Sequence, residues 1–160
     1  MGNSLSATPT DQVALRIIFI SETSNLASNA KLFEDFIISI NDYDNFNDLN
    51  ILEDFLKKSL SSSLKLNLWN IIDNKSREIR LELPIPVKRN TNDNLEDILG
   101  IKFRREQLSN SLSKIIRITD VQSNSAAKYA GIISMSDFIL TSLSFDYQDC
   151  DGFASAISNL

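Results

Sequence analysis

The tripeptide Asp-Phe-Ile occurs twice in the sequence, about 100 residues apart, and each copy ends a similar series of segments. An apolar segment comes first, a short stretch rich in Ser, Asn and Ala follows, and Asp-Phe-Ile opens a second apolar segment. The two series occupy residues 17–38 and 115–140. So long a spacing predicts two domains in tandem and not a solenoid, whose repeats are about 20–50 residues long.

The first series belongs to a longer region that mixes strand and helix patterns. Apolar residues that alternate or cluster predict five strands, at residues 13–20, 36–40, 64–69, 79–83 and 99–103. Leucines three and four residues apart predict a helix from Leu49 to Leu60, and residues 24–31 suit a single helical turn. Residues 73–76 read as a hairpin connection, residues 87–97 as a polar loop and residues 104–113 as a linker or loop. Five strands with two helices indicate an α+β fold.

The second series stops early by comparison with the first. It has no counterpart of residues 64–83 or 99–103, and it ends in a loop at 146–151 and the start of a helix at 153–160. We therefore expect an incomplete second copy. The expected organisation is a flexible terminus (1–11), a first domain (12–105) and a truncated second domain (106–160).

Composition argues against several classes of function. Histidine is absent and Cys150 is the single cysteine, so the chain lacks the usual His-based nucleophile pairs and metal sites, and no internal disulfide can form. The carboxylate pairs lie in polar stretches, where nothing predicts the burial that acid–base catalysis needs. We expect no catalytic residues, no metal and no cofactor. The net charge of −5 and the short basic runs give no reason to expect nucleic acid as a partner.

The chain begins Met1-Gly2-Asn3-Ser4-Leu5-Ser6, which fits the N-myristoylation pattern with Gly2 as the acceptor. No apolar run reaches about 18 residues, so we expect no membrane-spanning segment. One myristoyl chain binds membranes weakly and reversibly, with a constant of about 10⁴ M⁻¹. We therefore expect a second source of attachment, either a membrane-bound partner or self-association.

These features together resemble the GRASP family, the Golgi reassembly and stacking proteins. The resemblance rests on Met1-Gly2-Asn3, on the two Asp-Phe-Ile segments, on the strand Leu64 to Asn70, on Leu99-Gly100-Ile101, and on the Ser-x-Ala-x-x-Ala-Gly-Ile pattern at residues 125–132. The first series departs from the family pattern, because it has no glycine where Gly131 stands in the second. The family's long Pro- and Ser-rich tail is also missing.

The resemblance implies tandem PDZ-like domains with a circularly permuted strand order. The strand that borders the peptide groove then comes last in its domain, at Ile98 to Phe103, and faces the helix Leu49 to Leu60. In a PDZ groove a peptide is added as an extra strand, and backbone N–H groups of the adjacent loop hold its carboxylate. The groove residues implied are Leu52, Leu56, Ile98, Leu99, Gly100, Ile101 and Phe103. The apolar members of this set would also suit an ordinary core.

The family further implies a peripheral protein on the cytosolic face of Golgi membranes. Its partners would be a second copy of itself, through the first PDZ-like domain, a golgin-type coiled-coil protein, and the membrane through the acyl chain. Such a protein links cisternae and supports secretory traffic. The main alternative is a myristoylated PDZ scaffold at another membrane, such as the plasma membrane. An accessory domain of a protease and a hydrolase are further alternatives, which the sequence does not favour.

Overall fold

The computed structural model describes residues 11–58, 63–83, 93–140 and 150–158. The chain divides into two compact units, Met1–Ser109 and Asn110–Leu160. Gly2 and the N-terminal motif lie outside the described residues, as do residues 59–62 and 84–92.

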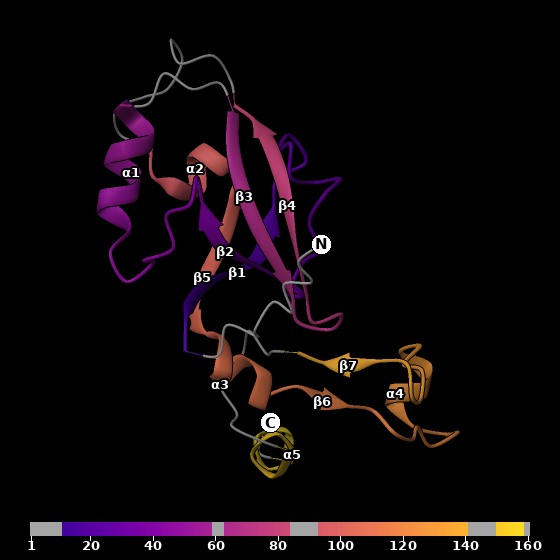
Figure 1. Cartoon of the computed structure of the whole chain (residues 1–160). Helices are drawn as coiled ribbons and strands as arrows, with labels where there is room; N and C mark the ends of the chain where they lie inside the picture. Colours follow the sequence, from indigo (N-terminus) through magenta and orange to yellow (C-terminus); the bar gives the residue numbers. More distant parts are fainter. Residues whose placement is uncertain (1–10, 59–62, 84–92, 141–149, 159–160) are drawn as a thin grey trace, which may run out of the picture. The chain divides into compact units, whose positions relative to one another are not determined.

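The first unit contains a five-stranded sheet, and all five predicted strands are present. Its strands are β1 (Val13–Ile20), β2 (Asp35–Ile40), β3 (Ser63–Asn70), β4 (Lys75–Glu82) and β5 (Ile101–Gln107), and its helices are α1 (Leu49–Lys58) and α2 (Leu95–Leu99). Every neighbouring pair is antiparallel, in the order β4-β3-β2-β1-β5. The strand that comes last in the unit therefore lies beside the first strand, at one edge of the sheet (Figure 1).

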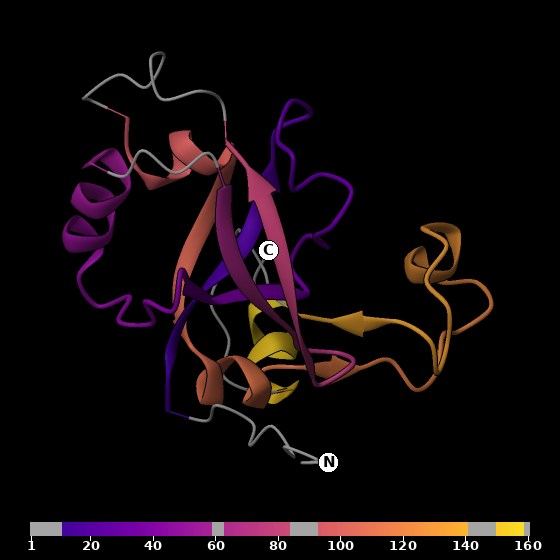
Figure 2. The ribbon, with the colours of Figure 1, turned by 45° about the horizontal axis from the view of Figure 1, so that its top comes forward.

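The core of this unit lies between α1 and the sheet. Along β3, the leucines Leu64, Leu66 and Leu68 are fully buried, as a period of two requires of a strand with one face on the core. From α1, Leu52 and Leu56 join the same cluster, because residues four apart lie on one helix face. In Figures 1 and 2, α1 and α2 lie side by side at one end of the sheet.

Three local predictions for this unit are wrong. Residues 24–31 form turns and no helix, and the second helix is α2, which begins within the segment predicted as a polar loop and ends at Leu99. The strand predicted to begin at Ile98 begins at Ile101, because Ile98 and Leu99 end α2. The turn between β3 and β4 comes earlier than predicted, since Lys75 and Ser76 already pair with β3.

The prediction of a linker or loop at residues 104–113 is also wrong. β5 continues to Gln107, which pairs with Val13, and α3 (Leu108–Ser113) follows directly. The Leu108 N–H donates to the Gln12 carbonyl at 3.0 Å, so residues just past 105 are hydrogen-bonded to the start of the first unit. The division between the units accordingly falls after Ser109, four residues beyond the expected boundary.

Two ion pairs with buried members stabilise the sheet of the first unit. The fully buried Asp35 carboxylate accepts from both terminal nitrogens of Arg77, from the Asn70 amide at 2.9 Å and from the Lys31 N–H at 2.7 Å. The hydrogen bond from Arg77 to Asp35 raises the pKa of the Arg77 guanidinium, which keeps it charged. On the neighbouring strands, the buried Arg16 pairs with Glu106 at 3.0 Å.

Among its described residues, the second unit contains four short elements after the end of α3. These are β6 (Ile116–Arg117), α4 (Ala126–Tyr129), β7 (Phe138–Ile139) and α5 (Cys150–Ser158). β6 and β7 pair antiparallel as a two-stranded sheet. Several large apolar side chains are exposed here, among them Tyr129 (81%), Ile133 (60%) and Met135 (55%).

The same hydrogen bonds between side chains and the backbone occur in both units. At the start of β2, the Asp35 carboxylate accepts the N–H of Lys31, four positions earlier, at 2.7 Å. Directly before β7, the Asp137 carboxylate accepts the N–H of Ile133, also four positions earlier, at 2.9 Å. Phe33 and Met135, two residues before each aspartate, have positive φ angles of 64° and 63°.

Arginines complete this set of contacts. Arg16 donates to the Phe33 carbonyl at 2.7 Å, and Arg117 donates to the Met135 carbonyl at 3.1 Å. Each guanidinium also lies over the phenylalanine that follows the aspartate, Phe36 or Phe138. These contacts match Arg16 with Arg117. The two series in the sequence, which begin at residues 17 and 115, would instead match Arg117 with Phe19, three residues further along the first unit.

Candidate functional site

The candidate site is the free edge of β5 together with the segment that leads into it. β5 pairs with β1 along one side, and among the described residues no strand pairs with its other side. An unpaired edge presents backbone N–H and C=O groups to a further strand. The Phe103 N–H points to this outer side, because it donates to a Glu96 oxygen at 3.0 Å and not to β1.

α2 leads into this strand through a left-handed glycine. Asn94 and Asp97 form a capping box, in which each side chain accepts the other's backbone N–H. Gly100 ends the helix with φ 65°, and its N–H donates to the Glu96 carbonyl. A Cβ on Gly100 would lie 3.1 Å from the Ser24 Cβ, so glycine is favoured here by conformation and by space.

Carboxylates from two helices hold this segment in place. Glu53 on α1 accepts the Leu95 N–H at 3.0 Å, which joins the two helices directly. Glu96 on α2 reaches forward to Phe103 on β5. The sequence reasoning missed both glutamates. The signal for α2 was available in Asn94 and Asp97, three residues apart, before a pair of apolar residues.

The predicted groove residues divide into two groups. The first group is core, since the exposed fractions of Leu52, Leu56, Leu99 and Ile101 are 1%, 0%, 2% and 3%. The second group is partly exposed: Ile98 and Phe103 pack against the edge of that core. In α1 the exposed apolar residues are instead Ile51 (56%) and Phe55 (54%), which the sequence reasoning did not select.

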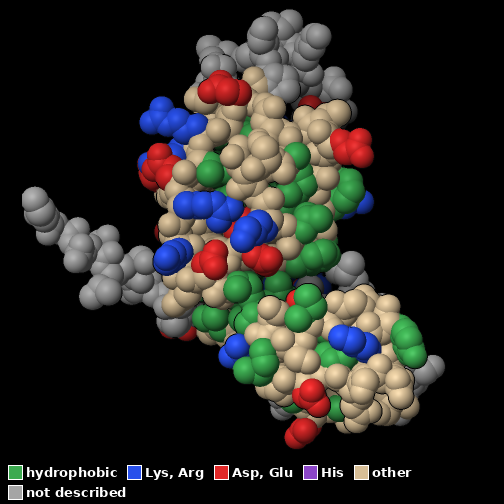
Figure 3. Space-filling model, turned by 90° about the vertical axis from the view of Figure 1, so that its right-hand side faces the viewer, with side chains coloured by type: hydrophobic (Ala, Val, Ile, Leu, Met, Phe, Trp, Pro, Cys, Tyr) green, Lys and Arg blue, Asp and Glu red, His purple; other side chains and the backbone are tan. Residues whose placement is uncertain are grey.

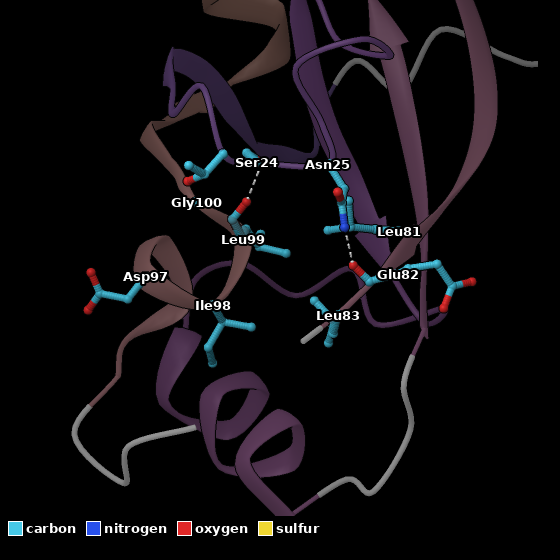
Figure 4. Close-up of a pocket in the computed structure, with 10 residues that line it drawn as sticks. Ser24, Asn25, Leu81, Glu82, Leu83, Asp97, Ile98, Leu99 and Gly100 are labelled. Atoms are coloured by element: carbon cyan, nitrogen blue, oxygen red, sulfur yellow. Dashed lines mark hydrogen bonds between the residues drawn. The ribbon is translucent and has the colours of Figure 1, made fainter. Parts of the chain in front are cut away.

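A small hollow with a volume of about 150 Å³ lies beside Gly100. It is enclosed by the loop after β1, the end of β4 and the end of α2. In Figure 4, Leu83 and Ile98 point toward it, whereas Asp97 points away. Two hydrogen bonds fix its wall: Ser24 donates to the Leu99 carbonyl at 2.7 Å, and Asn25 donates to the Glu82 carbonyl at 2.6 Å. These residues position Gly100 and the start of β5.

The surface carries charges of both signs. Lys and Arg side chains lie among Asp and Glu side chains on the face shown in Figure 3. Within the part of the chain that the structure describes, no three or more His, Cys, Asp or Glu side chains come together as a metal site. None of the described helices is long and apolar enough to cross a membrane.

The sequence also matches a known protein family. The model of the GRASP55/65 PDZ-like domain matches residues 66–160, more than half of the chain. The match begins within β3 and includes β4, α2, β5 and the second unit. No curated protein matches the chain. The mixed helices and strands and the antiparallel sheet fit a PDZ-like domain, and the chain belongs to the GRASP family.

Proposed function

We propose that this protein is a lipid-anchored tether on the cytosolic face of Golgi membranes, where it links cisternae by associating with itself. The observation that carries the proposal is the match to the GRASP55/65 PDZ-like domain, a family of Golgi stacking and tethering proteins. The free edge of β5 supports this proposal, because strand addition at an exposed edge is the PDZ mode of binding.

The tandem organisation is part of this proposal. The first unit is a PDZ-like domain in which the groove strand, β5, comes last in the unit instead of early, as circular permutation requires. The second unit is a second, incomplete copy. The recurring contacts support this reading, because Arg16 and Arg117 make the same bond to a residue with positive φ in each unit.

Membrane attachment in this proposal combines two weak contacts. Gly2 carries a myristoyl chain, whose binding constant of about 10⁴ M⁻¹ is marginal alone. Self-association through the first unit, or binding of a golgin-type coiled-coil protein, makes attachment multivalent. Linked sites gain about 10²–10⁴ in apparent affinity when they engage together. Opposed membranes, each with such anchors, would then adhere strongly and reversibly.

The test is vesicle clustering by the full chain, produced with and without N-myristoyltransferase. The acylated protein should bind neutral lipid vesicles and raise their light scattering as they cluster, whereas Gly2→Ala should do neither. Arg105→Glu keeps the anchor and alters an exposed position of β5, so it should bind vesicles and cluster them less. Equal clustering by wild type and Gly2→Ala would refute the anchor, and vesicle binding without clustering by wild type would refute the tether.

Imaging in cells separates the proposed location from its alternative. The tagged protein should colocalise with a Golgi marker and become diffuse as Gly2→Ala. Label at the plasma membrane that is lost on mutation would identify a scaffold at that membrane instead.

A further inference from the structure

We propose that the outer edge of β4 is a self-association surface, at which two copies of the chain pair their β4 strands antiparallel around a two-fold axis. β4 and β5 are the two end strands of the sheet. Among the described residues, no strand pairs with the outer side of β4. The inference goes beyond the proposed function, because it places a contact between copies away from β5 and needs no acyl chain.

The hydrogen bonds of the sheet decide which residues of β4 direct their backbone groups outward. On the neighbouring strand β3, the N–H and C=O of Lys65 both bond to Asn41, on the side of β2. Successive residues of a strand direct these groups to opposite sides, so the even-numbered residues of β3 bond toward β4. The register pairs them with odd-numbered residues of β4, which leaves the backbone groups of residues 76, 78, 80 and 82 directed outward. The Glu82 carbonyl agrees with this, because it accepts from the Asn25 amide.

The side chains of these outward residues carry charges of both signs. All four are exposed, namely Ser76, Glu78, Arg80 and Glu82. Among the described residues, the Glu78 and Arg80 side chains form no ion pair or hydrogen bond. Charges on an edge strand usually discourage pairing with other strands. Here their order along the strand decides which pairing they discourage and which they favour.

The order of charge favours one register for two copies of β4. In an antiparallel pair of identical strands, outward residues must lie opposite outward residues. An axis at Glu78 or at Arg80 sets that residue opposite its own copy, and like charges directly opposite destabilise a sheet. An axis at Ile79 instead sets Glu78 opposite Arg80 of the second copy, and Arg80 opposite its Glu78. This register forms two opposite-charge pairs, each of which exchanges two backbone hydrogen bonds.

The registers on either side of these are weaker. An axis at Arg77 forms no opposite-charge pair within β4. An axis at Leu81 sets Arg80 opposite Glu82, whose carbonyl is already bound by Asn25. The axis in the middle of the strand is therefore the one that satisfies both the backbone and the charges.

A dimer formed in this way leaves β5 free in both copies, because β4 and β5 lie at opposite ends of the sheet. Contact through one edge strand buries little surface, so the dimer is weak and reversible. Its two β5 edges belong to one particle, and linked sites gain about 10²–10⁴ in apparent affinity when both engage. The β4 contact thus adds valency to whatever the β5 edge binds.

Sedimentation equilibrium of the full, unacylated chain measures the dimer. We expect a reversible monomer–dimer equilibrium with a dissociation constant between about 10 µM and 1 mM. Glu78→Arg and Arg80→Glu should each weaken the dimer by about tenfold or more, because each turns both symmetric pairs from attractive to repulsive. Asp44→Arg is the matched control, since it makes the same change of charge at an exposed residue before α1 and should leave the dimer unchanged.

Mixing the two charge variants tests the register itself. A copy with Glu78→Arg has two arginines at these positions, and a copy with Arg80→Glu has two glutamates, so each pair across the axis joins opposite charges again. The mixture should therefore associate as tightly as the wild type. Labelling one variant at Cys150, the single cysteine and an exposed one, lets fluorescence-detected sedimentation follow the mixed dimer. Urea unfolding followed by Trp69 fluorescence checks that each variant is folded.

The outcomes separate this inference from the proposed function. A wild type that stays monomeric up to about 1 mM would overturn the inference, and vesicle clustering would still decide the proposed tether. Charge variants that weaken the dimer and do not recover on mixing would overturn the antiparallel β4 contact. A dimer that Arg105→Glu dissociates and the β4 variants do not would place self-association at β5, against this inference and in favour of the proposed function.

Discussion

Replacing Arg77 by Met should destabilise the first unit far more than its position on an edge strand suggests. Arg77 lies on β4, and its side chain is 38% exposed. Its partner Asp35, in contrast, is fully buried at the start of β2. Arg77 also donates to the Asn29 carbonyl at 2.8 Å, which fastens the turn before β2. Methionine keeps most of the side-chain volume and removes every one of these bonds.

The magnitude follows from what remains around Asp35. Removing one member of a buried pair usually costs about 3–5 kcal/mol, because the other charge stays buried and uncompensated. Asp35 would keep the Asn70 amide and the Lys31 N–H, which places the expected loss near the lower end, at about 3 kcal/mol. With a urea m-value of about 1.5–2 kcal/mol/M, the midpoint should fall by about 1.5–2 M.

Urea unfolding followed by Trp69 fluorescence measures this loss. Trp69 is the single tryptophan, is 1% exposed and lies on β3 beside Asn70, so its signal reports on the first unit. Arg80→Met is the matched control, because Arg80 is exposed on the same strand opposite Lys65. We expect the control to stay within about 0.5 kcal/mol of the wild type. Equal effects of the two substitutions would refute the claim that Asp35 depends on Arg77.

Three other substitutions test the description of α1 and α2 by the same assay. Gly100→Ala should cost about 1–2 kcal/mol, because alanine is strained at φ 65° and its Cβ would crowd Ser24; wild-type stability would contradict the left-handed cap. Leu56→Ala should cost about 2–5 kcal/mol, because Leu56 is fully buried, whereas Phe55→Ala should change stability by less than about 1 kcal/mol. The reverse order would show that α1 presents its other face to the core.

The parts of the fold that follow from short-range pattern could be predicted from the sequence. Alternation gave β3, since Leu64, Leu66 and Leu68 lie on one face, and leucine spacing gave α1. The same pattern could not separate core from groove. The spacing of Leu52 and Leu56 is the same whether a bound ligand or the sheet packs on that face of the helix. In the structure both residues pack in the core with residues of the sheet. The hydrogen bond from the Phe103 N–H to Glu96 could not be predicted from the sequence, because it depends on the left-handed turn at Gly100.

The two units show the same division between local and distant contacts. The contacts they share join residues near one another in the chain, such as Asp137 with Ile133 and Arg117 with Met135, so a repeated sequence can rebuild them. The contact that distinguishes the two units joins residues that are far apart in the sequence, Asp35 and Arg77. Asp35 is fully buried and bound by Arg77 from β4, whereas Asp137 is partly exposed, and no described residue of the second unit supplies an arginine to it. Water can solvate the Asp137 charge, as it cannot for Asp35. The same motif therefore serves as a buried anchor of the sheet in the first unit and as a solvated turn in the second.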